Sequence, residues 1–291
     1  MSNLNFWEQH VFMQITPDAM IRGVQFEFIE KILTYGIIPV AVKLSEVDAD
    51  MIDELYAEVI AGNWQTWRYR LIEDAFSIAP SLAMICRVKD QPNPHAFVKS
   101  IKGNQHPHLM SDGQLRRDFG AINAILGIVH ASDNPDESEK DALVFGLSSK
   151  DIIVNEEASI SLAFNLAKLS TPERPETRNF SLVLSQLRRE ILVNYWHALS
   201  SYDIKFISEY LKHPGGLASA KFSDSVKGQL GGKVPEDILQ ILAFTFTPDS
   251  NKPGRLSELF KTIERNRVRL DKWQRLVLES SCYFPPRKSV E

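Results

Sequence analysis

The chain has 291 residues and a formal net charge of −4, with 44% hydrophobic and 24% charged residues. This is the composition of an ordinary globular protein, and its slightly acidic balance makes nucleic acid an unlikely partner, because such binders are usually basic. Apolar runs stay well short of the roughly 20 residues that span a bilayer, and the N-terminus lacks the basic and apolar parts of a signal peptide. We therefore expect a cytoplasmic protein without a membrane segment.

Cysteine usage and length set two further limits. Cys86 and Cys282 are the two cysteines and lie far apart in the sequence, so neither a disulfide framework nor a cysteine metal site is expected. A reducing compartment is the default for such a chain. With 291 residues the chain is long enough for two domains.

The first half of the chain alternates short apolar runs with amphipathic stretches. Four apolar runs have the length of strands, and helical spacing lies between and after them. This order of elements predicts an α+β fold, a ferredoxin-like antiparallel sheet with covering helices on one face. The predicted strands are 11–15, 37–44, 81–88 and 127–131; the predicted helices are 19–35, 47–60, 64–77, 93–101 and 115–126, then one with Ser132 or Asp133 as N-cap.

The second half has a different texture. Beyond Leu147 nearly every segment has helical spacing, interrupted by proline- and glycine-rich breaks. We therefore predict two domains, residues 1–148 with the sheet and residues 149–291 as an α-helical accessory domain. The helices predicted in the second domain are 156–169, 179–212, 218–230, 235–246 and 255–281.

His130 is the strongest candidate for chemistry in the first domain. It stands where a predicted strand meets the N-terminus of a helix, whose free backbone N–H groups favour anions, and Arg116 and Arg117 lie upstream as cations that could meet a phosphate. Neutral imidazole can attack phosphorus and hold a phosphoryl group transiently. A histidine at the end of an apolar strand is also commonly a satisfied core residue, and the residues alone leave both interpretations open.

Three ordered segments carry a resemblance to a known family. TPD (16–18) with Arg22-Gly23, then GQLRRDF (113–119), then IVHASD (128–133) and an acidic helix resemble the KPD…RG, GxxRxDF and IIHGSD motifs of nucleoside diphosphate kinases. The resemblance covers about half of the chain. It implies that family's ferredoxin-like fold for the first domain and a site for nucleoside di- or triphosphates.

The resemblance also implies roles for single residues. His130 would accept the γ-phosphoryl group of one nucleotide and pass it to another, through a phosphohistidine. Mg²⁺ would bridge the bound phosphates with few direct protein ligands. The other implied site residues are Arg116 and Lys99 on the phosphates, Tyr56 near them, Trp64 near the aromatic residue that stacks on the base, and Ser132 and Asp141 near the histidine, with Asp141 replacing a glutamate.

Departures from the family pattern matter as much as the matches. The lysine before Pro-Asp is Thr16 here, and the asparagine three residues before the histidine is Gly127. Both changes remove groups that would contact the nucleotide, and the lost lysine would stabilise charge on the transferring phosphoryl group. Further departures are Ala19 and Ala131 in place of two glycines and Gln105 in place of a threonine. There is also one extra residue between Phe119 and His130. In an alignment shifted to allow for it, Asn123 could stand in for the missing asparagine.

These observations support a nucleotide-binding protein with a kinase-like site at His130 and slow or specialised phosphoryl transfer or nucleotide hydrolysis. The alternative is a catalytically inactive module that senses nucleotides or assembles, with a helical domain that binds a protein partner. A third possibility is an interaction scaffold with a vestigial site. Because relatives of this fold commonly self-associate and an exposed strand edge needs covering, we expect a homo-oligomer.

Three weaker signals remain open. His106 and His108 suggest a metal site but are more simply solvated loop histidines, since no third ligand stands at suitable spacing. The stretch 255–278 has an excess of four positive charges and could contact nucleic acid or phosphates, or could be a solvated face whose apolar side packs. An aromatic run is best explained as helical core: Phe180, Tyr195, Trp196, Tyr202, Phe206 and Tyr210.

Overall fold

The computed structural model describes residues 6–61, 66–250 and 255–286. Its contacts divide the chain into two compact units, Met1–Thr177 and Arg178–Glu291. The domain boundary after residue 148 stays a prediction; in the structure, helix α10 (Glu156–Leu169) packs on the sheet of the first unit. Within the described residues, no helix combines the length and apolarity needed to cross a bilayer.

The first unit is built on a four-stranded antiparallel sheet in the order β2-β3-β1-β4. The ferredoxin-like sheet and the four strands expected from the apolar runs are confirmed. Their bounds are β1 His10–Ile15, β2 Ile37–Ser45, β3 Ser81–Val88 and β4 Val129–Ala131. The last strand is shorter than expected, because Ile128 has a φ of 71° and cannot continue an extended strand.

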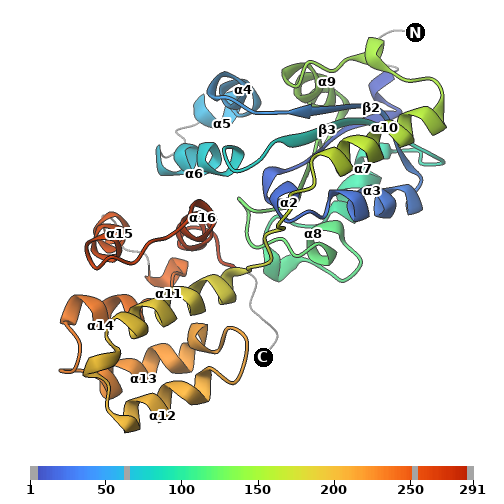
Figure 1. Cartoon of the computed structure of the whole chain (residues 1–291). Coiled ribbons are helices and arrows are strands. Elements are labelled where there is room, and N and C mark those ends of the chain that lie inside the picture. The colour runs from blue at the N-terminus through green and yellow to red at the C-terminus, as the bar shows by residue number, and fades with distance from the viewer. Residues whose placement is uncertain (1–5, 62–65, 251–254, 287–291) are drawn as a thin grey trace. The chain divides into compact units, whose positions relative to one another are not determined.

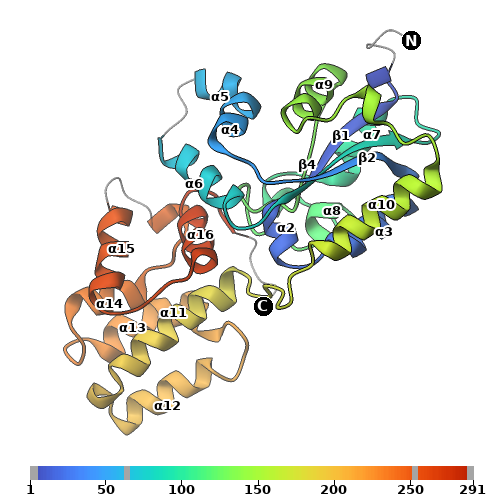
Figure 2. The ribbon, with the colours of Figure 1, turned by 45° about the horizontal axis from the view of Figure 1, so that its top comes forward.

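Helices cover both faces of this sheet, so the expectation of helices on one face is wrong (Figure 2). Alternate residues of β1 belong to two separate cores: Val11 and Met13 to one, Phe12 to the other. A strand buried on both faces reads as a continuous apolar run, which carries no mark of how many faces are covered. Helices α3 (Gln25–Thr34), α7 (Pro94–Lys102) and α10 contribute to the first core, and α4 (Ala49–Leu55) and α9 (Pro135–Val144) to the second.

Turns interrupt three helices that were expected to be continuous. The stretch 47–60 forms α4 and α5 (Ala57–Ala61), separated at Tyr56, the C-cap of α4. The stretch 19–35 forms α2 (Pro17–Ile21) and α3, separated at Gly23, whose φ is 70°. The stretch 115–126 is helical only in α8 (Leu115–Asp118), because the chain turns at Gly120 (φ 73°) and the Asn123 side chain then accepts from two backbone N–H groups. Helices α5 and α6 (Thr66–Phe76) complete the unit.

The chain covers the outer edge of β2 with its own residues. The backbone N–H of Ile153 donates to the Val40 carbonyl at 2.8 Å, and Ser159 Oγ donates to the Pro39 carbonyl at 2.6 Å. Ala163 and Ala167 of α10 are buried in the first core. This edge is therefore occupied by backbone and side-chain donors from the same chain.

The second unit is entirely helical among its described residues (Figure 1). The predicted helices 179–212 and 255–281 each divide into two, because Ser200 and Asp271 form capping boxes that start new helices. The helices are α11 (Phe180–Asn194), α12 (Ser201–Tyr210), α13 (Ala220–Leu230), α14 (Glu236–Ala243), α15 (Arg255–Arg265) and α16 (Lys272–Ser281).

The aromatic run lies largely outside the core of this unit, so its interpretation as helical core is wrong in part. Trp196 and Tyr202 are 68% and 69% exposed. Phe206 and Tyr210 are half-buried and contact the buried Phe222, with ring centroids 6.1 and 5.1 Å from it. Helical spacing places side chains on one face but does not show whether another helix covers that face.

A buried arginine connects separate segments of the second unit. Arg188 of α11 is fully buried and donates to the carbonyls of Leu217 and Phe244, the latter at 2.8 Å. Its guanidinium lies 5.3 Å from the centroid of the Phe222 ring. Burial lowers the pKa of Arg188 to about 9. Two buried carbonyls of distant segments therefore depend on this side chain for a donor.

Replacing this arginine should destabilise the second unit. We expect Arg188→Met to lower the free energy of unfolding by about 2–4 kcal/mol, because the volume is retained while both carbonyls lose their donor. Urea unfolding of the full chain measures the change. Arg189→Met is the matched control, since Arg189 is exposed, and should change stability by less than about 0.5 kcal/mol. Equal changes in the two variants would contradict this role.

Candidate functional site

The imidazole of His130 is held by a carboxylate on the neighbouring helix. His130 lies on β4 opposite Gln14 of β1, and its Nε2 is 2.9 Å from Asp141 Oδ2 of α9. Ser132 Oγ donates to the same Oδ2 at 2.7 Å. Asp141 is buried, whereas the His130 side chain is 43% exposed. The histidine is thus oriented from one side and open to solvent on the other.

Asp18 holds the turn before β4, in which Ile128 has an unfavourable backbone conformation. Ile128 has a φ of 71°, in the left-handed region that β-branched residues avoid. Its N–H donates to Asp18 Oδ2 at 3.0 Å, and its carbonyl accepts from the Thr16 N–H at 3.1 Å. Such strain costs on the order of 1–3 kcal/mol and persists only where the surroundings fix it. These two hydrogen bonds set the path of the chain two residues before His130.

Asp18 itself is buried with few compensating charges. Burial raises the pKa of its carboxyl, and the hydrogen bond from Thr16 Oγ1 to Asp18 Oδ1, at 2.6 Å, acts in the opposite direction. Arg22 lies near enough to lower that pKa further and donates to the Gly120 carbonyl at 2.9 Å. The hydroxyl that replaces the family's lysine is therefore engaged with the aspartate of the same motif.

Cations surround the backbone on either side of His130. Arg116 of α8 donates to the Val129 carbonyl from Nη2 at 3.0 Å and to the Gly103 carbonyl from Nη1 at 3.2 Å. Burial lowers the pKa of this guanidinium. Lys102 of α7 donates to the Ala131 carbonyl at 2.7 Å, and burial lowers its pKa. The two carbonyls adjacent to His130 are thus both held by cationic side chains.

A second carboxylate connects the two lysines of α7. Asp133 accepts from Lys99 Nζ at 2.7 Å and from Lys102 Nζ at 3.2 Å. The hydrogen bond to Asp133 raises the pKa of Lys99, whose side chain is 62% exposed. Lys99 can therefore exchange this carboxylate for an incoming anion without leaving solvent. Asp133 and Lys102 were not expected beside His130, although Asp133 lies inside the HASD motif and Lys102 follows Lys99 by one helical turn.

Tyr56 belongs to the same neighbourhood, at the C-terminus of α4. Burial, and after it the charge of Asp141, raises its pKa to about 12, against the opposing charges of Arg68 and Arg116. The phenol is therefore protonated at neutral pH and can act as a donor. Trp64, the residue implied near the base, lies outside the described residues.

The N-cap expected at the start of α9 is one residue further on. Asn134 is the N-cap, because its side chain accepts from the Glu137 N–H at 2.9 Å, so the expectation of Ser132 or Asp133 is wrong. The shift frees Ser132 for Asp141 and Asp133 for the lysines. Each polar residue of this short segment thus has a different partner.

The positions that depart from the family pattern have definite surroundings. A Cβ added to Gly127 would meet Arg116 Nε at 3.8 Å, an ordinary contact, so a side chain can be accommodated there. Asn123 is buried, and its Oδ1 accepts from the N–H groups of Ile125 and Leu126. Its carboxamide oxygen is therefore already hydrogen-bonded within the 123–126 loop.

No cluster among the described residues resembles a protein-built metal site with three or more His, Cys, Asp or Glu side chains. The rings of His106 and His108 lie 5.9 Å apart, and Gln105 Nε2 is 3.4 Å from His106 Nε2.

Comparison with known proteins identifies relatives of the first unit. Residues 9–149 match the family model described as nucleoside diphosphate kinase. The nucleoside diphosphate kinase of Archaeoglobus fulgidus is 29% identical over 147 residues, which cover 50% of this chain and 91% of that protein. That of Methanobrevibacter smithii is 30% identical over 137 residues, covering 47% of this chain and 86% of that protein. The solved structure of a nucleoside diphosphate kinase family protein from Babesia bovis is 19% identical to this chain, with a TM-score of 0.44. The match covers 53% of this chain and 99% of the Babesia bovis chain.

Substitution of Asp18 tests whether it holds the strained turn. We expect Asp18→Ala to lower the free energy of unfolding by about 1–3 kcal/mol, because the buried N–H of Ile128 loses its acceptor. Asp18→Asn should cost less, since the amide oxygen can still accept from Ile128 and the buried charge is removed. Urea unfolding compares the two variants. Equal losses would show that the charge, and not the hydrogen bond to Ile128, is what matters.

Proposed function

Because the chain belongs to the nucleoside diphosphate kinase family through residues 9–149, we propose that its first unit binds a nucleoside triphosphate and transfers the terminal phosphoryl group slowly, by way of His130. The observation that carries this proposal is the 2.9 Å contact between His130 Nε2 and Asp141 Oδ2. A carboxylate at one ring nitrogen leaves the other available as a nucleophile.

The contact selects the tautomer of the imidazole. With the proton on Nε2 and donated to Asp141, the lone pair lies on Nδ1. In the transfer, the Nδ1–phosphorus bond forms while the bond from the γ-phosphorus to the bridging oxygen breaks, and that oxygen leaves on the nucleoside diphosphate. The Nε2 proton stays in place, and Asp141 stabilises the positive charge of the ring. The reverse sequence passes the group to another nucleoside diphosphate.

The surrounding donors fit a polyphosphate chain. Arg116 has five N–H donors, of which Nε–H, one on Nη1 and one on Nη2 are directed at carbonyl oxygens, so two remain for phosphate. Lys99 can move from Asp133 to a phosphate oxygen, and Tyr56 can donate its phenolic proton. Mg²⁺ would be carried by the nucleotide, with few direct protein ligands, and would supply charge neutralisation for its phosphates. Stacking of the base on Trp64 stays a prediction from the resemblance.

Two missing groups account for slow transfer. Thr16 offers a hydroxyl already bonded to Asp18 where the family has a cation, and Gly127 offers no side chain. Loss of one preorganised donor commonly costs about a hundred- to a thousandfold in rate. Slow transfer to a nucleotide or to water, that is, hydrolysis, fits a site that keeps the nucleophile and loses its electrostatic support.

The second candidate is a nucleotide-sensing or assembly module without chemistry. It is favoured by the same Thr16 contact, because a site that keeps phosphate ligands and loses the charge-stabilising cation can bind without reacting. In this alternative the helical unit binds a protein partner. Self-association, also expected from the sequence, would have to use a surface other than the covered β2 edge. A cytoplasmic location stays a prediction.

Labelling with nucleoside triphosphate tests the phosphohistidine directly. We expect γ-labelled nucleotide with Mg²⁺ to transfer label to the protein in an acid-labile, base-stable form, and His130→Gln to abolish it. Asp141→Asn should reduce the labelling rate by roughly tenfold or more, because the ring loses its charged partner. Ser148→Ala, outside the site, is the control. Nucleotide binding with no label on the native protein would move the sensing module to first place.

Restoring the family's lysine and asparagine tests why phosphoryl transfer would be slow. We expect Thr16→Lys to raise the rate at saturating nucleotide by roughly tenfold or more, and addition of Gly127→Asn to raise it further, since the backbone there accepts a Cβ. His130→Gln in the same background should abolish the gain. Tighter nucleotide binding without a faster rate would mean that the introduced cation contacts the ground state only.

A further inference from the structure

The two units differ strongly in charge. Residues 178–291 contain 18 lysines and arginines against 12 aspartates and glutamates, a net charge of +6. Residues 1–177 contain 15 against 25, a net charge of −10. The overall charge of −4 hides this difference. A basic excess confined to one unit points to an acidic partner for that unit.

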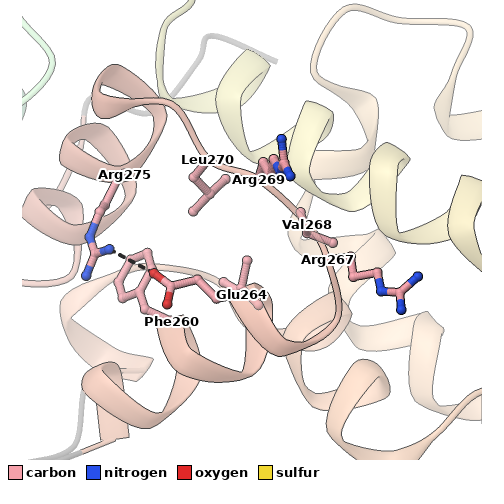
Figure 3. A pocket seen from close by; sticks show the side chains of 8 residues that line it. Phe260, Glu264, Arg267, Val268, Arg269, Leu270 and Arg275 are labelled. Carbon is pink, nitrogen blue, oxygen red and sulfur yellow. Dashed lines mark hydrogen bonds and ion pairs between the residues drawn. The ribbon is translucent and has the colours of Figure 1, made fainter.

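Two adjoining cavities in the second unit are lined by five arginines and three acidic residues, Glu190 among them, an excess of two positive charges. The first, of about 640 Å³, lies between α15, the connection to α16 and α16 (Figure 3). Its apolar lining is Phe260, Ile263, Val268 and Leu270. The second, of about 520 Å³, shares Arg269 and Leu270 with the first. Because both cavities are lined by Arg269 and Leu270, we treat them as one binding surface and call it the Arg269 cleft.

Only some of the arginines along the Arg269 cleft are compensated. Arg275 pairs with Glu264 at 3.0 Å, the contact dashed in Figure 3, and Arg178 pairs with Asp271 at 2.8 Å. Three more line the cleft with exposed side chains, and their guanidinium groups make no hydrogen bond or ion pair with any residue that the structure describes. These three are Arg189, Arg267 and Arg269.

The backbone holds Arg267 at a position that glycine usually occupies. Arg267 has a φ of 61° and follows the end of α15, where its N–H donates to the Glu264 carbonyl at 2.9 Å and the Val268 N–H donates to the Ile263 carbonyl at 3.2 Å. This is the Schellman pattern, in which the left-handed residue is most often glycine because a Cβ is unfavourable there. An arginine at this position carries a conformational cost that no hydrogen bond or ion pair of its guanidinium with the described residues offsets.

The layout of the cleft distinguishes between possible ligands. In Figure 3, Arg275 and Arg267 lie at opposite ends of the first cavity, so they cannot converge on one small anion. The Phe260 ring lies 5.2 Å from the Arg275 guanidinium, which occupies its face, and the rest of the apolar lining is aliphatic. Single-stranded nucleic acid commonly stacks its bases on free aromatic faces, and the aromatic residue that lines the first cavity is Phe260. An extended chain with separated carboxylates and an aliphatic side chain between them fits better.

We propose that the Arg269 cleft binds an acidic protein segment, with an aliphatic side chain in the first cavity and carboxylates on Arg267, Arg269 and Arg189. Arginine is enriched at protein interfaces, and charge complementarity speeds encounter and selects partners. The site is independent of phosphoryl transfer at His130, so either proposal can fail without the other.

Fluorescence anisotropy on the full-length protein tests this surface. The probe is a short fluorescein-labelled peptide in which single leucines separate pairs of glutamates, and we expect binding that weakens with salt. Arg267→Glu with Arg269→Glu should weaken it by roughly tenfold or more, whereas the matched reversal Lys221→Glu with Lys227→Glu, on exposed positions of α13, should leave it within about twofold. A peptide with serine for leucine should bind more weakly than the probe.

A second variant separates binding from folding. Arg267→Gly removes the charge and suits the left-handed backbone, so peptide affinity should fall while the melting temperature stays the same or rises. The proposal is overturned if the native protein does not bind the peptide at millimolar concentration, or if Arg267→Glu with Arg269→Glu leaves the affinity unchanged. It is also overturned if a single-stranded oligonucleotide of equal charge binds more tightly at the same arginines, which would assign the cleft to nucleic acid.

Discussion

The buried carboxylate of Asp18 is the constraint on which the geometry of the first unit's site depends. It accepts the N–H of Ile128, a β-branched residue in the left-handed region, and so fixes the turn from which β4 starts. Two residues later His130 faces Asp141, and the carbonyls on either side of the histidine meet Arg116 and Lys102. If the turn relaxed, the register of β4 on β1 would change and the imidazole would lose its carboxylate. The strain at Ile128 is thus stored two residues before the His130 imidazole, whose orientation it helps to fix.

The same carboxylate shows how the site departs from its family. Thr16 cannot reach toward a phosphate as a lysine would, and its hydroxyl instead donates to Asp18. The motif therefore retains its part in positioning the backbone while the electrostatic part is missing. Arg116 combines both parts in one side chain, since it binds two backbone carbonyls and keeps further donors. This separation of positioning from charge stabilisation is why binding and reaction rate are distinct questions for this protein.

Local pattern was sufficient for the strands and for the helix 156–169, whose bounds agree with α10. It was insufficient where a turn depends on one residue's backbone conformation, as at Gly23, or on a cap that competes with helix continuation, as at Ser200. His130 and Ser132, which the family motifs single out, both contact Asp141 in the structure, and their roles toward a nucleotide stay predictions. The Lys99–Asp133–Lys102 cluster was not foreseen as a cluster, because it depends on how α7 lies against β4, which no short sequence window contains. Coverage of both sheet faces and exposure of Trp196 likewise depend on neighbours far along the chain.

The residues that follow the family match, from 150 to 177, determine where the first unit can be cut from the rest of the chain. Residues 9–149 end before Ile153 and Ser159, whose donors occupy the outer strand, and before the two alanines that close one core. A fragment ending there would present unpaired carbonyls of β2 beside an uncovered apolar face, the combination that favours strand addition between molecules. The segment from Ile153 through helix α10 therefore protects the edge and one face of the sheet from other molecules. The smallest fragment that keeps the sheet protected ends beyond Thr171, to which Gln25 donates at 3.1 Å.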